Sequence, residues 1–273
     1  MRFLRQANHY FEKFKGVIKL TNILEINDLT KRFGGIQALD GVSLNLNEKE
    51  IVGLIGPNGC GKSTTFNVMS GVMEGDGGSV MLYGEEVYGL PSDQINRLGM
   101  SRTYQDTRLW RDLTVIENLM LPPKNQLGVK VLNSLFTRNR IKKEEKEILE
   151  KAYDTLDLLE ITHMANHYCS ELSGGQSKLV DLGRVLMSDP KILLLDEPVA
   201  GVAGPLAEKI FERIGTLRDE LGLSVLIIEH NMDFILQQGV DRVFVMSNGR
   251  VVVEGTPSEI QQSKTVIEAY LGE

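Results

Sequence analysis

The segment GPNGCGKS, Gly56 to Ser63, has the spacing of a loop that binds phosphate. It matches the pattern G-x-x-x-x-G-K-[ST] and completes an apolar run, EIVGLIG, that is typical of a buried strand. Glycines let the backbone approach phosphate oxygens closely, and the N–H groups at the start of the following helix face their negative charge. We expect Lys62 to reach the β- and γ-phosphates and the Ser63 hydroxyl to bind Mg²⁺. A chance glycine turn is the alternative, and the position after a strand argues against it. The residues expected to contact a nucleotide here are Gly56, Pro57, Asn58, Gly59, Cys60, Gly61, Lys62, Ser63 and Thr64.

Two adjacent acids, Asp196 and Glu197, end a second apolar run, Ile192 to Leu195. Ligands of open α/β sheets bind beside the carboxyl ends of the strands, so acids at this position would face bound phosphates. Asp196 is suited to hold Mg²⁺ through its water shell, and Glu197 is suited to polarise an attacking water. Taken alone, such a pair could equally cap a helix or face solvent. The phosphate loop in the same chain favours the chemical role.

Two further side chains could complete a nucleotide site. Phe33 precedes the phosphate loop and could stack on the base, although a lone aromatic is more often part of a core. His230 ends the run SVLIIEH and could hydrogen-bond both the γ-phosphate and the water, although a single His is more often structural. Both roles are hypotheses that depend on the phosphate loop.

The elements that position these residues follow a layered α/β pattern. Short apolar runs alternate with helical patterns, which predicts a partly parallel sheet. DRVFVM and RVVVEG flank Ser247-Asn248-Gly249, and Asn-Gly between such runs predicts a hairpin. The other strand-like runs are ILEINDL, VSLNL, EIVGLIG, VMLY, ILLL and VLII.

Between about Leu98 and Tyr168 the pattern becomes helical, and strand-like runs are absent. The charged block RIKKEEKEILEKAYDTLDLLE places its apolar residues on one helix face, at positions 148, 149, 152, 156 and 159. We therefore predict a helical subdomain of about residues 98–185, inserted in a domain of residues 23–273. With 8 prolines and no proline-rich linker, this subdomain should rest on the α/β core.

Composition excludes several classes of protein. The net charge of −7 argues against a general nucleic-acid binder. No run reaches the roughly 18 to 20 apolar residues of a transmembrane helix, so membrane action would require docking. Cys60 and Cys169 give no disulfide framework, and a reduced cytosolic setting is the default. Residues 1–22 are basic and amphipathic, and they are either an untidy extension or a helix that binds a membrane surface or a partner.

The segment ELSGGQSKLVDLGRVLM separates this chain from other proteins with a phosphate loop. Its serine and glycines open a helix with an apolar stripe, which gives the chain a second helix start able to bind phosphate. The order of phosphate loop, Gln105, LSGGQ, LLLDE and His230 resembles the ATP-binding subunits of ATP-binding cassette (ABC) transporters, from about Asn22 onward.

The resemblance implies a RecA-like P-loop NTPase core with an antiparallel β subdomain and an inserted helical subdomain. It also implies ATP hydrolysis between two such subunits, homo- or heterodimeric, docked on membrane-spanning subunits at the cytoplasmic face of the cell membrane. Gln105 would meet Mg²⁺ and the water, and its loop would contact the membrane-spanning partner; alone, it could be a surface amide. The residues that would act in trans on the partner's ATP are Leu172, Ser173, Gly174, Gly175 and Gln176.

The finer resemblance is to importers of branched-chain and other hydrophobic amino acids. It is carried by SRTYQDTRLWRDLTVIENLML, LLLDEPVAG, IEHNMDFI and VIEAYLGE. Importers of urea and short amides and the lipopolysaccharide-export ATPase look similar, so cargo and direction stay open; a separate binding protein and the membrane subunits would select the cargo. A soluble ABC ATPase of translation or repair is the remaining alternative in this superfamily. An unrelated kinase or GTPase would not need LSGGQ.

Two departures from the family pattern bear on mechanism. Ser177 and Lys178 follow LSGGQ, where a Gln or Arg and then a basic residue are usual. The segment Val199–Ala207 lacks the Asp or Asn that commonly hydrogen-bonds across the dimer, whether Ala203 or Gly204 is the equivalent position. A neutral hydrogen bond contributes about 0.5 to 1.5 kcal/mol, so we expect looser communication between two ATP sites and a working ATPase.

Overall fold

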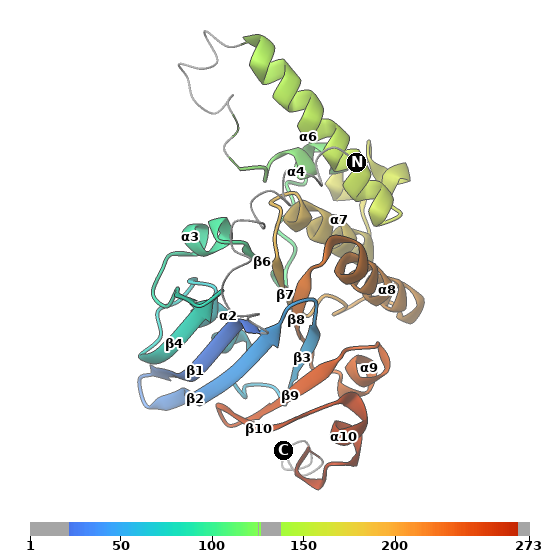
Figure 1. Cartoon of the computed structure of the whole chain (residues 1–273). Helices are drawn as coiled ribbons and strands as arrows, with labels where there is room; N and C mark the ends of the chain where they lie inside the picture. Colours follow the sequence, from blue (N-terminus) through green and yellow to red (C-terminus); the bar gives the residue numbers. More distant parts are fainter. Residues whose placement is uncertain (1–21, 125, 127–137, 267–273) are drawn as a thin grey trace.

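The computed structural model describes residues 22–124, 126 and 138–266 (Figure 1). Residues 1–21 lie outside this part of the chain, so the amphipathic pattern of the N-terminal extension stays a prediction. A four-stranded antiparallel sheet has the order β2-β1-β4-β5. Its strands are β1 (Asn22–Phe33), β2 (Ile36–Asn47), β4 (Gly77–Leu82) and β5 (Glu85–Glu86).

The second sheet has six strands in the order β10-β9-β3-β8-β7-β6. Five of them run parallel, and β10 pairs antiparallel with β9 at one edge. The hairpin predicted from Asn248-Gly249 is confirmed, and both residues adopt the positive φ angles, 49° and 76°, that a tight turn requires. The strands are β3 (Ile51–Ile55), β6 (Met100–Arg102), β7 (Ile192–Asp196), β8 (Ser224–Ile228), β9 (Arg242–Ser247) and β10 (Arg250–Gly255).

Strand β6 corrects one expectation. It lies within the stretch predicted to hold only helices, yet Met100, Ser101 and Arg102 pair in parallel with β7 at the sheet edge. Three residues are too few for an alternating pattern, and the sheet rather than local sequence fixes their conformation. The stretch predicted as a helical subdomain therefore begins with a strand of the core sheet.

The helices lie around the six-stranded sheet, and the longest, α6, extends away from the core (Figure 1). Ala152 and Leu156 of α6 are buried, as is Leu159 just after the helix, and Ile148 and Leu149 are partly buried against the same core, which confirms the predicted face. The helices are α2 (Lys62–Met69), α3 (Ser92–Arg97), α4 (Val115–Met120), α6 (Arg138–Leu158), α7 (Gly174–Leu186), α8 (Gly204–Leu221), α9 (Met232–Gln237) and α10 (Pro257–Gln262), with short 3-10 turns η3 (Thr162–Met164) and η4 (Cys169–Glu171).

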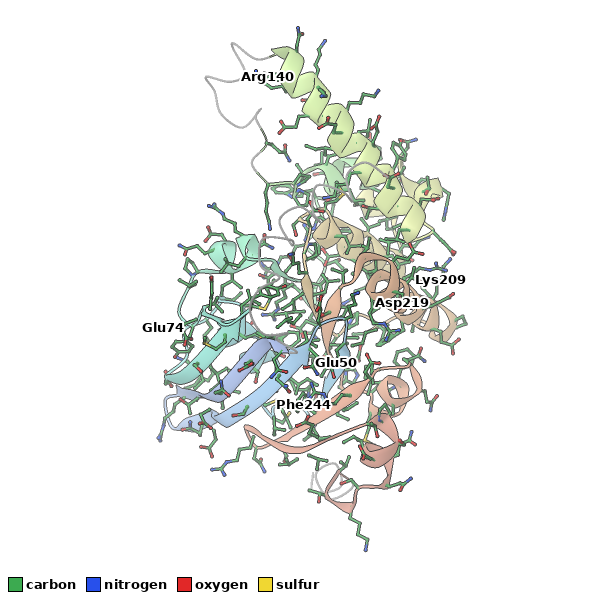
Figure 2. All side chains as sticks on the ribbon, viewed as in Figure 1. Glu50, Glu74, Arg140, Lys209, Asp219 and Phe244 are labelled. Atoms are coloured by element: carbon green, nitrogen blue, oxygen red, sulfur yellow. The ribbon has the colours of Figure 1, made fainter. Side chains whose placement is uncertain are left out.

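The core has two parts, one on each face of the six-stranded sheet. Figure 2 shows the described side chains on the ribbon. Successive strand side chains point to opposite faces, so Leu193 and Leu195 of β7 join the part that includes α7 and α8, whereas Leu194 joins the part that includes α2 and the antiparallel sheet. Among the described residues, no helix is long and apolar enough to span a bilayer. The predicted α/β class with a partly parallel sheet and a separate antiparallel sheet is confirmed.

Candidate nucleotide site

The phosphate loop connects β3 to α2, as its sequence predicts. Gly56 and Gly61 adopt φ angles of 153° and 111°, which disfavour residues with a Cβ. A Cβ on Gly56 would lie 2.2 Å from the Met246 carbonyl oxygen, and one on Gly61 would lie 2.7 Å from the Ala38 carbonyl oxygen. Gly59, at the exposed part of the loop, would meet nothing within 4 Å. Backbone packing therefore fixes both ends of the loop and leaves its middle open.

Lys62 is buried at the start of α2 and is held by the loop itself. Its Nζ donates to the carbonyl oxygens of Gly56, at 2.6 Å, and Pro57, at 2.9 Å. Ser63 is exposed beside it. The ammonium is thus positioned within the loop by acceptors that phosphate oxygens could replace.

Cys60 is a packing residue of this loop. Its thiol is buried, and burial raises its pKa although Lys62 opposes the shift. A thiol with a raised pKa carries little thiolate and reacts slowly. Its role agrees with that of a small residue tolerated in the loop.

Asp196, at the end of β7, pairs with a residue that sequence analysis missed. The Arg102 guanidinium lies 2.6 Å from Asp196 Oδ2, and both side chains are only 7% exposed. Arg102 also donates to Asn67 Oδ1 on α2, which connects the phosphate-loop helix to the acid. A cation ending a strand of the core sheet was the available signal, but that strand is too short to recognise.

Glu197 stands in a strained conformation that other elements support. Its φ is 49°, uncommon for a residue with a Cβ, and its N–H donates to the Ile228 carbonyl oxygen of β8. Gln105 Nε2 donates to Glu197 Oε2 at 2.8 Å. The structure thus brings together two of the predicted catalytic residues, which are 92 positions apart.

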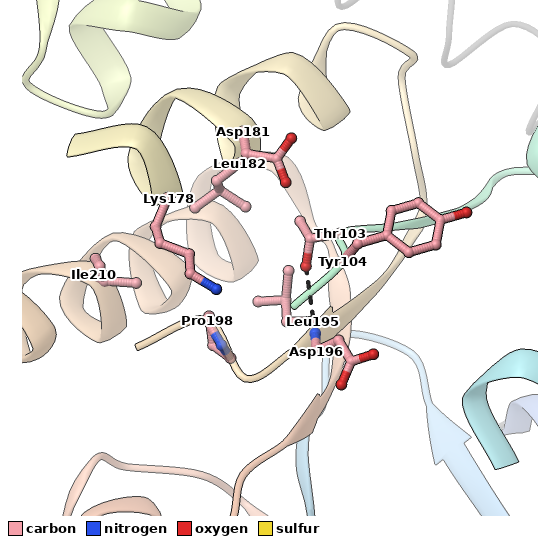
Figure 3. A pocket seen from close by; sticks show the side chains of 9 residues that line it. All are labelled: Thr103, Tyr104, Lys178, Asp181, Leu182, Leu195, Asp196, Pro198 and Ile210. Atoms are coloured by element: carbon pink, nitrogen blue, oxygen red, sulfur yellow. Dashed lines mark hydrogen bonds between the residues drawn. The ribbon is translucent and has the colours of Figure 1, made fainter. Parts of the chain in front are cut away.

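Lys178, on α7 two residues after LSGGQ, contacts the backbone of both Gln105 and Glu197. Its Nζ donates to the carbonyl oxygens of Gln105, at 2.5 Å, and Glu197, at 3.1 Å. Figure 3 shows its amine lying beside Pro198, near the end of β7. Lys178 was noted in the sequence only as a departure from a motif, because its partners come from two other segments of the chain.

His230 lies beside two carboxylates. Its Nδ1 is 3.7 Å from Glu197 Oε1 and 3.9 Å from Glu229 Oε2, and its side chain is 50% exposed. Glu229, which sequence analysis missed, is 1% exposed and accepts from the Val199 N–H. Burial raises the pKa of Glu229 to about 7, with a smaller contribution from the nearby Glu197. An exposed imidazole beside Glu197 can contact both a phosphate and a water that approach from solvent.

The segment LSGGQ begins α7 on the other face of the sheet. Ser173 caps the helix, because its hydroxyl accepts from Gln176 N–H while Gln176 Oε1 accepts from Ser173 N–H. Leu172 packs against the core part that includes α8, whereas Cys60 of the phosphate loop belongs to the opposite part. Gly175 packs closely on the start of α8 and on the loop before it, since a Cβ there would lie 2.3 Å from Leu206 and 3.0 Å from Val202. The helix that begins in LSGGQ and the helix that follows the phosphate loop therefore lie on opposite faces of the six-stranded sheet.

The loop after Glu197 and the side chain of Phe33 keep the features their sequences indicate. Ala203 is the N-cap residue of α8 and offers no side-chain hydrogen bond. Phe33 is exposed at the end of β1, with Lys31 Nζ 5.6 Å from its ring centroid. Stacking of Phe33 on a base stays a prediction.

A groove of about 290 Å³ opens at Trp110, at the end of the segment of residues 103–110 that contains Gln105 and is called the Gln105 segment below. Its lining includes the exposed apolar side chains of Trp110 (63% exposed) and Leu121. It also includes Arg102 and Arg184, whose largely buried side chains pair with Asp196 and Asp181. Arg184 donates to the Arg108 carbonyl oxygen, so α7 also holds this segment at a second point. The groove lies between strand β6 of the core sheet and helix α7.

Comparisons with known proteins identify the family of this chain. A family model described as ABC transporter matches residues 39–200, and a model of branched-chain amino acid ATP-binding cassette transporters matches residues 250–273. The high-affinity branched-chain amino acid transport ATP-binding protein BraF of Pseudomonas aeruginosa is 39% identical, over 92% of this chain and 98% of that protein.

Solved structures of cassettes have the same fold. A nucleotide-free ATP-binding cassette from an ABC transporter superposes with a TM-score of 0.80 and 39% identity, covering 92% of this chain and 100% of that one. A dimeric cassette bound to ADP and phosphate gives a TM-score of 0.70 and 27% identity, covering 86% and 98%. The predicted P-loop NTPase fold and family are confirmed, and the chain belongs to the ATP-binding subunits of ABC transporters, which hydrolyse ATP.

Proposed function

We propose that this chain drives an importer of branched-chain or other hydrophobic amino acids. The observation that carries the proposal is the match of residues 250–273 to cassettes of branched-chain amino acid transporters. That segment lies outside the nucleotide-contacting residues, so it reports on the kind of transporter rather than on ATP binding. Two relatives, BraF of Pseudomonas aeruginosa and LivG of Salmonella typhimurium, are branched-chain amino acid transport ATP-binding proteins, which supports the same cargo.

The roles of the site residues form part of the proposal. The phosphate-loop N–H groups and Lys62 hold the β- and γ-phosphates, and His230 contacts the γ-phosphate. Glu197 takes a proton from the attacking water as general base. The oxygen donors of Ser63, Gln105 and Asp196 fit Mg²⁺, which prefers oxygen ligands and comes with its nucleotide. When bound, this ion neutralises phosphate charge.

ATP binding exchanges contacts that the chain makes with itself. Lys62 releases the carbonyl oxygens of Gly56 and Pro57, and the Gln105 amide releases Glu197. Nucleotide binding therefore frees the catalytic carboxylate and moves the Gln105 segment. This segment borders the groove at Trp110, which gives ATP binding a direct route to a docked partner.

A second ATP-binding subunit completes each site. Within one chain LSGGQ and the phosphate loop belong to opposite core parts, which supports action of Leu172–Gln176 on a partner's nucleotide. Ser173 caps α7, and a Cβ on Gly174 would meet no atom within 4 Å. The N-terminus of α7 is therefore open to that nucleotide. A dimeric cassette among the structural neighbours supports the same arrangement.

The membrane-spanning subunits dock in the groove beside Gln105. The exposed side chains of Trp110 and Leu121 suit a short partner helix with apolar residues. The chain then lies peripherally at the cytoplasmic face, and the substrate-binding protein acts on it only through the membrane subunits. Nucleic acid is not a partner in this proposal.

Copurification from membranes tests this function. Tagged chain is isolated from its own host, and the copurified subunits are identified and assayed in vesicles for ATP-driven uptake of leucine, isoleucine and valine. We expect permease subunits and uptake, and we expect Trp110→Ala to lower the yield of permease. Recovery of a ribosome- or DNA-bound complex contradicts the transport role, and uptake of urea alone contradicts the cargo.

A further inference from the structure

We propose that Arg102 is a positioning residue that serves as the internal counter-ion of Asp196 and competes with Mg²⁺ for that carboxylate. The inference rests on the proposed role of Asp196 at the metal. Arg102 NH2 lies 2.6 Å from Asp196 Oδ2 at the end of two neighbouring strands, β6 and β7. A cation that approaches the Asp196 carboxylate is therefore repelled by the Arg102 guanidinium.

The burial of the pair gives Arg102 its importance. Both side chains are 7% exposed, and a buried carboxylate without a partner is costly. Nucleotide-free protein therefore needs a cation beside Asp196, and Arg102 supplies it. Mg²⁺ that is bound at the site would neutralise the Asp196 carboxylate in place of Arg102.

The guanidinium is held in place by groups other than Asp196. Its NH1 donates to Asn67 Oδ1 at 2.7 Å and to Ser70 Oγ at 3.2 Å, both on or beside α2. Its central carbon lies 5.5 Å from the Phe66 ring centroid and 5.1 Å from the Tyr104 ring centroid. Arg102 therefore stays near the site if Asp196 turns toward a metal.

The contact with Asp196 is of the kind that can be exchanged. A bidentate Arg–carboxylate pair uses two parallel N–H bonds, whereas here a single nitrogen is paired with Oδ2. The Arg102 Nε is buried and has no hydrogen-bond partner among the described residues. One contact can be given up while those to Asn67 and Ser70 remain.

This arrangement makes metal entry depend on the nucleotide. Free Mg²⁺ must overcome repulsion from Arg102, whereas Mg²⁺ that arrives with ATP brings phosphate charge that offsets the guanidinium. The resting site thus keeps a low affinity for the metal alone. Because Asn67 lies on the phosphate-loop helix α2 and Ser70 is its C-cap residue, exchange at Asp196 is linked to that helix.

The test compares nucleotide affinity with and without metal in Arg102→Met. A non-hydrolysable ATP analogue is titrated by calorimetry in EDTA and in saturating Mg²⁺. The dissociation constant in EDTA is divided by the dissociation constant in Mg²⁺, so a larger ratio means a stronger dependence on the metal. We expect this ratio to rise at least about tenfold over wild type, because the variant leaves Asp196 to the metal alone. An unchanged or smaller ratio overturns the proposal, since Arg102 would then only support the fold or orient Asp196 for the metal.

Arg242→Met is the matched control. Arg242 pairs with the part-buried Glu50 at 2.9 Å, at the amino ends of β9 and β3, whereas the phosphate loop follows the carboxyl end of β3, so its loss removes an ion pair away from the proposed metal ligands. We expect the wild-type ratio in this variant. A similar rise there shows a general effect of weakened packing and contradicts the proposal.

Two further variants separate the possible failures. Asp196→Asn should abolish most of the metal dependence; if it does not, the proposed metal role of Asp196 fails, whatever Arg102 does. If Arg102→Met does not fold, Arg102→Gln removes the charge with a polar side chain. A wild-type ratio in that variant, with a normal Asp196→Asn result, overturns the inference about Arg102 alone.

Discussion

Strands β3 and β7 flank β8 in one sheet, and their carboxyl ends form the nucleotide site in different ways. The loop after β3 is fixed by glycine backbone that packs on neighbouring carbonyl groups. The residue after β7 is a glutamate at φ 49°, held by side chains from Gln105 and by Lys178 on another helix. Local backbone packing fixes the loop after β3, whereas side chains from distant segments hold the residue after β7. We therefore expect substitutions after β3 to lower stability and substitutions after β7 to lower catalysis.

The largest expected effect follows from Glu197→Gln. Glutamine keeps the shape and can still accept the Gln105 hydrogen bond, but it cannot take a proton from water. We expect ATP hydrolysis to fall at least about 100-fold while ATP binding persists and traps a dimer. Phosphate release and size-exclusion chromatography with ATP measure both. Rapid hydrolysis by this variant would show that another group is the base.

Gly56→Ala tests whether backbone packing fixes the β3 end. The added Cβ meets the Met246 carbonyl oxygen, so we expect a loss of about 2 kcal/mol or more in unfolding free energy, with weaker ATP binding. Denaturant unfolding measures the loss. Gly59→Ala is the control, because its site is open and only the positive φ of 77° opposes alanine. Equal losses in the two variants would contradict the packing argument.

Glu229→Gln tests the buried carboxyl behind the β7 end. The folded pKa of about 7 lies above the ordinary 4.5, so folded protein binds this proton more tightly than unfolded protein does. Its contribution to stability is full below pH 4.5 and is lost as the pH rises through 7. Wild type should lose up to about 3 kcal/mol relative to the variant over this range. Denaturation of both proteins at pH 5 and 8 measures the difference, and parallel profiles would contradict it.

Ala203→Asp has the smallest expected effect and sharpens the question of the missing Asp. Ala203 is the uncapped N-cap position of α8, so aspartate should raise the unfolding free energy by about 1 kcal/mol even in a monomer. Ala203→Ser shares this cap but has a shorter side chain for a partner. Tighter ATP-driven dimerisation in Ala203→Asp than in Ala203→Ser would indicate an interfacial hydrogen bond. Equal dimerisation of these two variants, together with no effect of Gly204→Asp on turnover or dimerisation, would show that the missing group is irrelevant.

The sequence by itself determined the features that depend on local spacing. The phosphate loop, the Asp-Glu strand end, the capped helix at Ser173 and the Asn248-Gly249 hairpin are each contained within a few residues, and each lies where its pattern predicts. Their order along the chain was enough to identify the family. Glycine spacing, helix caps and turn dipeptides act through the backbone next to them, which is why they can be read locally.

Only the tertiary structure decided which side chains hold the catalytic groups. The partners of Asp196 and Glu197 come from segments 94 and 92 residues away, and β6 became a strand only by pairing with β7. Arg102, Lys178 and Glu229 are ordinary charged residues in the sequence. Arg102 and Glu229 are buried and Lys178 is partly buried near Asp196 and Glu197. Their position makes them important, because removal of water strengthens a charge interaction in a way that no spacing records.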